Sequence, residues 1–234
     1  MENTRRESMV AHGQRFNPAE IPAYSVAQVA FCLGLPYGTL EYWLEPRTGP
    51  LVLAPDPRPM TLCFKNLVEC HVLRALRVSF RLPMRNIKRG VLTLRAKWNT
   101  RYPLAEKELS HDGLELFLEE WPALYNVSRF GNQAFSEVVR PYLERIDRDP
   151  RGVARRFFPI LTKGPEVETQ PRFIVIDPKI CFGNPVIDGT RITTSVVAGR
   201  FRAGERLTKL AKQYGRSEEE IRAAIQFETR RRTA

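Results

Sequence analysis

The sequence predicts a mostly helical protein in which two helix-turn-helix modules, the first of them winged, are joined by a middle segment of helices and short strands. Apolar residues recur at the spacing of one helical face, and Ser, Gly and Pro stand where such helices would begin or end. The β-prone runs are short and bounded by Pro or Gly. The expected parts are a flexible N-terminus (1–23), a winged helix-turn-helix domain (24–103), a connecting segment with a linker (104–171), a helical domain (172–229) and a basic tail (230–234).

A pair of helices is predicted between residues 25 and 44. Ser25 can accept a backbone N–H at the start of the first helix, and Gly34 can adopt the positive φ of its end. Pro36 has a φ suited to the start of a second helix, expected over 39–44. The residues expected to face inward are Val26, Val29, Ala30, Leu33, Leu40 and either Trp43 or Leu44. Such a pair forms a helix-turn-helix, whose second helix enters the major groove of DNA.

A two-stranded wing is expected beside this pair, because the apolar runs 51–53 and 60–62 flank a Pro-Asp-Pro-Arg-Pro turn. A helical period resumes from about Lys65, and a further amphipathic helix starts at Leu82–Pro83. The residues predicted to lie near base edges are Tyr37, Thr39, Glu41 and Tyr42, and those predicted to contact phosphates are Arg47, Arg58, Lys65 and Arg85. The alternative is a three-helix packing unit in which Tyr42 and Trp43 are core residues.

The charge distribution points to anionic partners at both ends of the chain. The 234 residues carry a net charge of +11 at neutral pH. Residues 1–100 contribute +7, residues 101–171 contribute −2 and residues 172–234 contribute +6. No acidic residue occurs between Glu69 and Glu106, an interval that holds nine Lys and Arg residues. We therefore expect an anion-binding face in that interval, with nucleic acid as its natural ligand.

Composition argues against a membrane protein and against a metal site. No apolar run approaches the ~18 to 20 residues that a membrane span requires, and the N-terminus lacks the apolar segment of a secretory signal. Cys32, Cys63, Cys70 and Cys181 form no C-x-x-C pair, and each has apolar neighbours typical of a reduced core thiol. With only three histidines in the chain, a metal centre is not expected. These features predict a cytoplasmic protein without a cofactor.

The middle segment is expected to connect the modules rather than to catalyse a reaction. The run 114–118 could form a short strand, the spacing from Phe135 to Ile146 indicates an amphipathic helix, and 152–170 has the Pro and Gly content of a linker. Its carboxylates lack the histidine or metal-ligand partner that acid–base catalysis needs. We interpret them as solvated helix ends and loops: Glu119, Glu120, Asp147 and Asp149. No enzymatic activity is therefore expected.

The C-terminal module begins with a β-prone run, 172–176, followed by a compact loop rich in Pro and Gly. Helices are expected near 196–201, through 207–211, and after Ser217, which opens a capping box with Glu220. Within the first run, Phe173–Ile176 is a candidate edge strand for pairing with a second copy. A two-fold dimer of this kind would match a palindromic operator.

Two segments resemble known families. The stretch from Tyr24 to Trp43, with the wing and Phe64–Glu69, resembles the winged helix-turn-helix domain of MerR-like regulators. No effector-binding cysteine loop or long coiled-coil helix follows it, so an inducer-sensing regulator is not expected. The C-terminal module resembles a small helical domain of unknown function found in bacterial antitoxins, whose hallmark is Asp-Pro followed by Gly-x-Pro-x-Ile-x-Gly-Thr-Arg-Ile. The matching positions are Asp177, Pro178, Gly183, Pro185, Ile187, Gly189, Thr190, Arg191 and Ile192.

The whole chain resembles the longer VapB-like antitoxins. The resemblance implies the antitoxin of a type II toxin–antitoxin system, which neutralises a PIN-domain ribonuclease toxin and represses its own operon by binding operator DNA. The implied assembly is a homodimer or a hetero-oligomer with the toxin. Because PIN-type nucleases hold a divalent metal with carboxylates, Arg230, Arg231 and Arg232 could shield that site. They could equally be the solvated cations of a helix end.

Other interpretations remain open at this stage. The chain could be a standalone DNA-binding transcriptional regulator, or an enzyme acting on nucleic acid, although the missing carboxylate and histidine constellation argues against the latter. The Gly-Thr-Arg-Ile motif could hold a ligand. It could equally form a turn in which Asp188 and Arg191 pair with local backbone or with each other.

Overall fold

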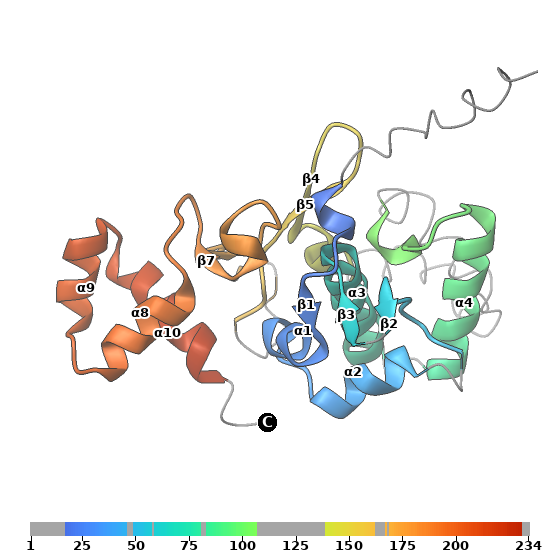
Figure 1. The fold of residues 1–234 in the computed structure, drawn as a ribbon, viewed down its shortest axis with the longest axis horizontal. Coiled ribbons are helices and arrows are strands. Elements are labelled where there is room, and N and C mark those ends of the chain that lie inside the picture. Colours follow the sequence, from blue (N-terminus) through green and yellow to red (C-terminus); the bar gives the residue numbers. More distant parts are fainter. Residues whose placement is uncertain are drawn as a thin grey trace, which may run out of the picture.

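A computed structural model describes residues 17–45, 49–57, 59–80, 83–106, 139–161, 167 and 169–230. Helices dominate these residues and are joined by small antiparallel sheets, so the predicted mostly helical class is confirmed. Figure 1 shows α8, α9 and α10 gathered at one end of the molecule and α4 at the other, with α3 between them. Among the described residues, no helix combines the length and the hydrophobicity needed to cross a lipid bilayer.

The described residues of the N-terminal part form four helices, two 3-10 turns and one sheet. Its helices are α1 (Val26–Leu33), α2 (Tyr37–Leu44), α3 (Phe64–Phe80) and α4 (Met84–Lys97), and its 3-10 turns are η1 (Pro18–Glu20) and η3 (Pro103–Ala105). Its strands are β1 (Tyr24–Ser25), β2 (Asp56–Pro57) and β3 (Met60–Leu62).

The predicted caps of the first helix pair are confirmed. The Ser25 hydroxyl accepts the amide of Gln28 at 3.2 Å, and the Gln28 side chain accepts the amide of Ser25 at 2.7 Å. Gly34 ends α1 with a φ of 61°, a conformation that glycine adopts without steric cost. Helix α2 begins at Tyr37, two residues earlier than predicted, directly after Pro36. Its inward side chains are Leu40, Trp43 and Leu44, all buried.

The wing differs from the prediction in its first strand. β3 pairs with β1 on one side and with β2 on the other, so Asp56–Pro57 rather than 51–53 is the partner of 60–62. Leu51 and Val52 are both buried, and their amides donate to the Trp43 carbonyl at 2.9 and 3.3 Å. A half-exposed wing strand buries alternate residues. Two adjacent buried side chains therefore attach this segment to the end of α2.

Helix α3 runs through the core of the N-terminal part. The residues that follow the helical period after Lys65 are all buried: Leu67, Val68, His71, Val72, Ala75 and Leu76. Asn66 accepts the amide of Cys63 at 3.1 Å and donates to the Leu53 carbonyl at 3.1 Å. This buried amide side chain therefore caps α3 and ties the 51–53 segment to it.

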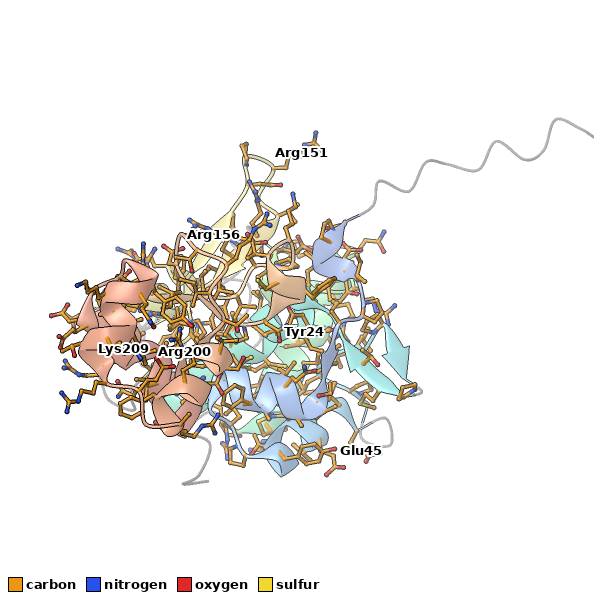
Figure 2. All side chains as sticks on the ribbon, turned by 60° about the vertical axis from the view of Figure 1, so that its left-hand side comes forward. Tyr24, Glu45, Arg151, Arg156, Arg200 and Lys209 are labelled. Atoms are coloured by element: carbon orange, nitrogen blue, oxygen red, sulfur yellow. The ribbon has the colours of Figure 1, made fainter. Side chains whose placement is uncertain are left out.

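The middle segment contains a hairpin where a linker was expected. The strands β4 (Ile146–Arg148) and β5 (Ala154–Phe157) pair antiparallel, so part of the predicted 152–170 linker is a strand. Residues 139–143 are helical, which confirms that much of the helix predicted from Phe135 to Ile146, although Ile146 itself begins β4. The strand predicted over 114–118 lies outside the described residues. Figure 2 shows the hairpin projecting from the body, with Arg151 near its tip.

The C-terminal module follows the predicted order of elements. It contains β6 (Ile174–Val175), the 3-10 turn η5 (Cys181–Gly183), β7 (Val186–Ile187), α8 (Thr194–Arg202), α9 (Leu207–Tyr214) and α10 (Glu218–Thr229). Thr193 is the N-cap residue of α8, without a side-chain cap bond. The predicted capping box of α10 is confirmed, because the Ser217 hydroxyl accepts the Glu220 amide and the Glu220 carboxylate accepts the Ser217 amide.

The run Phe173–Ile176 has partners inside the chain. β6 pairs with β7, and Ile176 exchanges two backbone hydrogen bonds with Phe157 of β5, at 3.0 and 2.9 Å. The run was predicted to be a free edge for pairing with a second copy. Its described backbone instead links β7 to the hairpin, because each short strand satisfies its amides and carbonyls through the next one. The expected strand-paired dimer therefore loses its proposed edge.

Arg145 holds the loops around the hairpin together. The side chain is 2% exposed. Its guanidinium donates to five backbone carbonyls at 2.8 to 3.3 Å, those of Phe158, Pro159, Val167, Gln170 and Pro171. Burial lowers the pKa of Arg145 to about 10, so the group still carries its charge at neutral pH. One side chain thus satisfies carbonyls that no strand or helix pairs.

We predict that Arg145→Lys lowers the free energy of unfolding by about 2 to 4 kcal/mol, because one ammonium cannot replace a five-donor fork and leaves buried carbonyls unpaired. Urea unfolding followed by circular dichroism measures the change. The matched control is Arg155→Lys at an exposed position of β5, expected within about 0.5 kcal/mol of the wild type. Equal stability of both variants would contradict the role given to Arg145.

We predict that the stability gained or lost through Glu69 depends on pH. Burial raises the pKa of this carboxyl to about 8 from an ordinary 4.5, against the opposing charge of Arg95. The folded state therefore holds the proton more tightly than the unfolded state. Glu69 therefore contributes most to the free energy of unfolding below pH 4.5, and this contribution is lost as the pH rises toward 8.

Glu69→Gln keeps the side chain neutral at every pH, so its stability relative to the wild type should rise by about 4 kcal/mol between pH 5 and pH 9. Urea titrations of both proteins across that range measure the difference. Burial lowers the pKa of His71 to about 3, but both proteins carry that group, so its effect cancels. A difference that stays constant with pH would show that Glu69 is ionised in the folded protein.

Candidate nucleic-acid and partner interfaces

The outer face of α2 carries the residues predicted to lie near base edges. Tyr37 and Tyr42 are each 52% exposed; Glu41 is also exposed, and Thr39 is half-buried. The opposite face is anchored by the buried Trp43, so α2 presents two tyrosines from a rigid support. Exposed aromatic side chains of this size are enriched at binding surfaces.

Helix α4 supplies the positive charge next to α2. It contains no acidic residue, and Arg85, Arg89 and Lys97 are exposed on it. The Lys88 ammonium lies 3.0 Å from the position that a Cβ at Gly49 would occupy, so α4 adjoins the segment that follows α2. Arg85 is exposed on this basic helix, and its contact with phosphate stays a prediction.

Basic residues of the acid-free interval also bind the protein itself, and Arg74 donates to the Leu33 carbonyl at 2.6 Å. Arg95 donates to the Leu51 carbonyl at 2.8 Å, and Arg101 donates to the Ala54 carbonyl. Both guanidiniums fasten the segment between α2 and the wing to the end of α4. The predicted anion-binding face therefore has fewer available cations than the nine Lys and Arg residues of this interval.

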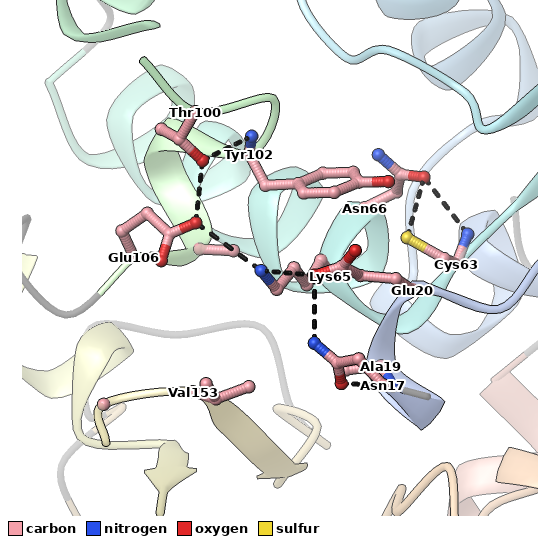
Figure 3. Close-up of polar contacts among 12 residues, drawn as sticks. Asn17, Ala19, Glu20, Cys63, Lys65, Asn66, Thr100, Tyr102, Glu106 and Val153 are labelled. Carbon is pink, nitrogen blue, oxygen red and sulfur yellow. Dashed lines mark hydrogen bonds and ion pairs between the residues drawn. The ribbon is translucent and has the colours of Figure 1, made fainter. Parts of the chain in front are cut away.

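Lys65 does not belong to the phosphate-binding set, which corrects the prediction. Its Nζ lies 2.9 Å from Glu20 Oε1 and 3.6 Å from Glu106 Oε1, and the residue is 8% exposed. Figure 3 shows this ammonium between η1 and the segment after η3. A cation this buried and twice paired serves the fold, because moving it to a phosphate would deprive Glu20 and Glu106 of their counter-ion. Arg47 and Arg58 lie outside the described residues.

The antitoxin-like motif forms a tightly bonded turn. The Thr190 hydroxyl donates to the Ile187 carbonyl at 2.7 Å and accepts the Ile192 amide at 3.0 Å. Asp188 lies 3.4 Å from Arg156 rather than against Arg191, which is exposed. The bonds of Thr190 to Ile187 and Ile192 support the interpretation that the motif forms a turn. The suggested Asp188–Arg191 pair is absent among the described contacts.

The first half of the motif loop has an unusual backbone. Asp177 is buried and accepts the Lys179 amide at 2.8 Å, which starts a turn after Pro178. Cys181, Phe182 and Gly183 then have φ values of 48°, 55° and 76°. The left-handed region is sterically unfavourable for residues with a Cβ, so consecutive Cys and Phe residues there indicate a constrained loop.

Gly183 is required by a close approach between the two modules. A Cβ at this position would lie 2.0 Å from the Tyr24 hydroxyl oxygen, closer than two atoms can come. Tyr24 belongs to β1 of the N-terminal part and is 4% exposed. Pro185, two residues later, accepts the Thr194 amide at 3.0 Å and so places the start of α8. The motif glycine thus lets the loop dock on β1.

A cavity of about 310 Å³ lies at this junction. It is lined by residues of β1 and α1, by the Phe182–Pro185 loop, by the start of α8 and by Glu228 of α10. Within it, the Tyr24 hydroxyl is buried without a hydrogen-bond partner. Among the described residues, no group of three or more His, Cys, Asp or Glu side chains is placed to hold a metal ion.

Arg230 is an internal contact, which corrects its assignment to an exposed tail. Its guanidinium donates to the carbonyls of Ile160, Phe31 and Cys32 at 2.7, 3.0 and 2.8 Å. It also lies 4.1 Å from the ring centroid of Phe227. The carbonyls at the end of α1 lack helical partners and carry partial negative charge. A cation there holds α10 against α1 and is not free for a toxin. Arg231 and Arg232 lie outside the described residues.

Several residues that shape these surfaces gave only weak signals in the sequence. Phe182 stands in the motif as an unspecified residue, and nothing in its neighbours reveals that it is exposed. Tyr24 and Gly183 approach each other closely although they lie 159 positions apart in the sequence. A glycine in a motif and a tyrosine at a strand end could only be related once the modules were placed together.

We predict that Arg230→Lys weakens the junction of the modules and lowers the free energy of unfolding by about 1 to 3 kcal/mol, because a single ammonium cannot reach three carbonyls and lie on an aromatic ring. Thermal and urea denaturation measure the change. Arg222→Lys, at an exposed position of the same helix, is the control and should be neutral. Unchanged stability of Arg230→Lys would show that the contact contributes nothing.

Comparisons with known proteins are consistent with these features. Residues 174–227 match the model of a family described as "Protein of unknown function (DUF433)". "Putative antitoxin VapB45" of Mycobacterium tuberculosis (strain ATCC 25618 / H37Rv) is 26% identical over 235 residues, covering 88% of this chain and 93% of the relative. "Uncharacterized protein Rv2308" of the same strain is 27% identical over 230 residues, covering 90% of this chain and 92% of that protein.

A solved structure shares the fold. The crystal structure of Rv2018 from Mycobacterium tuberculosis matches with a TM-score of 0.67 at 24% identity, covering 88% of this chain and 98% of that chain. The chain is therefore similar, over nearly its full length, to a protein named as an antitoxin, and its fold is shared by a solved structure from Mycobacterium tuberculosis.

Proposed function

We propose that this chain is the antitoxin of a type II toxin–antitoxin pair in the cytoplasm, binding operator DNA through α2 and α4 and neutralising a PIN-domain ribonuclease by direct contact. The observation that carries the proposal is the similarity to "Putative antitoxin VapB45", which spans 93% of that relative. A match of this extent includes both the N-terminal part and the C-terminal module. The ribonuclease partner is inferred from the resemblance to long VapB-like antitoxins.

The charges of α2 and α4 support base contacts by α2 and phosphate contacts by α4. Described residues of α2 include no cation, so Tyr37, Thr39, Glu41 and Tyr42 could read base edges but could not neutralise phosphates. The exposed cations of α4, Arg85 and Arg89, would supply the backbone contacts. Phosphate contacts of this kind position a protein, while base contacts specify the sequence.

The second helix pair is less suited to DNA. Helices α9 and α10 are joined through Gly215, which has a φ of 61°, much as α1 and α2 are joined through Gly34. However, α10 begins with Glu218, Glu219 and Glu220. A first turn with three carboxylates would repel the phosphates on either side of a major groove. This contrast supports the N-terminal module as the DNA-binding one.

Co-expression with the products of the adjacent genes tests the toxin partner. An antitoxin should copurify with one neighbour whose sole expression arrests growth, and should restore growth when both are expressed. Light scattering on the purified material then gives the stoichiometry. A chain that binds the upstream DNA but has no such neighbour would be a standalone transcriptional regulator.

We predict that Arg85→Ala and Arg89→Ala each weaken binding to the upstream DNA similarly for specific and random sequences, and lower the salt slope of the logarithm of affinity by about 1. Tyr42→Ala should instead reduce discrimination between the two sequences. Fluorescence anisotropy at several salt concentrations measures both effects.

Lys212→Ala, at an exposed position of α9, is the matched control and should leave DNA binding unchanged. If Lys212→Ala weakens binding while Arg85→Ala does not, the C-terminal module rather than the N-terminal one contacts DNA. A flat dependence on salt in the wild type would exclude a phosphate-dominated interface.

A further inference from the structure

Phe182 is the most exposed large apolar side chain among the described residues. It is 93% exposed, while Tyr37, Tyr42 and Val196, the next most exposed, are each 52% exposed. It also occupies left-handed backbone, with φ 55° and ψ 32°, directly after Cys181 at φ 48°. A fold that holds an aromatic residue in an unfavourable conformation and in water incurs two costs, and such costs cluster at functional sites.

The loop that carries Phe182 is held in place on both sides. The Gly183 amide donates to the Ile180 carbonyl at 2.9 Å, and the Asn184 amide and side chain both donate to the Cys181 carbonyl, at 3.0 and 2.8 Å. The close approach of Gly183 to Tyr24 fixes the loop against β1. The ring is therefore presented by a rigid turn, and its exposure is a built feature of the fold.

The cavity beside Phe182 contains a polar group that lacks a partner. Tyr24 is 4% exposed, lines the cavity, and has a hydroxyl with no hydrogen bond within the described part of the chain. Burial raises the pKa of this phenol, so it is a protonated donor at neutral pH. A buried hydroxyl without a partner is costly, and this one is covered by Gly183, so it is a further unfavourable feature of the junction that carries Phe182.

Two exposed cations, Lys179 and Arg191, belong to the loop that carries Phe182, and the Arg191 carbonyl lies 3.4 Å from the Cys181 sulfur. Among the described ion pairs, neither cation has a carboxylate partner. Two carboxylates also lie close by: Asp177 accepts the Lys179 amide at 2.8 Å, and Glu228, which lines the cavity, accepts the Thr194 hydroxyl at 2.6 Å. Acidic groups of an occupant would therefore be placed opposite Lys179 and Arg191 and away from the cavity wall at Glu228.

We propose that Phe182 is the anchor of a protein–protein interface, and that its partner is the toxin. The partner surface would offer an apolar socket for the phenyl ring and carboxylates opposite Lys179 and Arg191. This inference rests on the proposed antitoxin function and assigns toxin contact to the junction of the two modules. It replaces the suggestion that Arg230 contacts the toxin, because Arg230 binds carbonyls inside the chain.

A protein fits this surface better than a nucleic acid does. The cavity wall includes Ala23, Phe31, Cys32 and Pro185, which offer packing but no phosphate contacts. Two cations are few for a nucleic acid, whose affinity comes largely from neutralised phosphates. Aromatic anchors that fill a partner's pocket, surrounded by weaker polar contacts, are instead the usual centre of protein interfaces.

The test compares Phe182→Asn with the wild-type chain for binding to the copurifying neighbour, by isothermal titration calorimetry. Asn tolerates left-handed backbone better than Phe, so the variant should have an unchanged or higher Tm, yet bind the toxin at least tenfold more weakly. Leu92→Asn removes another exposed apolar side chain, 47% exposed on α4, and should bind like the wild type.

The double variant Lys179→Ala/Arg191→Ala is the second test, because it removes the two exposed cations beside the ring. It should be as stable as the wild type and bind the toxin about three- to tenfold more weakly. If Phe182→Asn and this double variant both bind like the wild type, the inference is wrong while the antitoxin function stands. If the wild type binds no neighbouring product, the proposed function itself fails.

Two further outcomes would overturn the choice of partner. Single-stranded RNA that binds the isolated wild type and not Phe182→Asn would assign the ring to base stacking. Self-association of the wild type that Phe182→Asn abolishes, seen by analytical ultracentrifugation without toxin, would assign the surface to a second copy of this chain.

Discussion

The fold depends on guanidinium groups that bind backbone carbonyls. Its sheets are small, so many loop carbonyls have no strand to pair with, and a buried carbonyl without a partner is costly. Arg145 satisfies five of them around the hairpin. Arg74 donates to the Leu33 carbonyl at 2.6 Å and Arg230 to those of Phe31 and Cys32, so two arginines complete the end of α1. Through these bonds α1, α3 and α10 are held together.

This use of arginine changes the meaning of the positive charge. A net charge of +11 indicates anionic partners when every cation is assumed to face solvent. Arg74, Arg95, Arg145 and Arg230 instead bind carbonyl groups, and Lys65 is held between two carboxylates. What remains for external anions is a smaller set of exposed cations, which includes Arg85 and Arg89 on α4 and Lys179 and Arg191 near Phe182. These two groups lie on different parts of the fold and can serve different partners.

Local features were predictable because their causes lie within a few residues. The caps at Ser25 and Ser217, the end of α1 at Gly34 and the inward face of α3 each follow from spacing and side-chain chemistry. The exposure of Tyr37 and Tyr42 follows similarly from the period of α2. The errors arose where distant segments compete. The run 51–53 was predicted to be a wing strand, but the amides of Leu51 and Val52 donate to the Trp43 carbonyl. Phe173–Ile176 was predicted to be a free edge, but Ile176 pairs with Phe157 of β5.

The sequence by itself determined the helical class and the caps and inward faces of the helices, since periodicity and capping are properties of neighbouring residues. Only the tertiary structure decided which charges are free, because an arginine is exposed or engaged according to the carbonyls that other segments bring to it. It also decided that Gly183 meets Tyr24 and that Phe182 stands in solvent beside a cavity. These are contacts between modules, and no local pattern records how two modules meet.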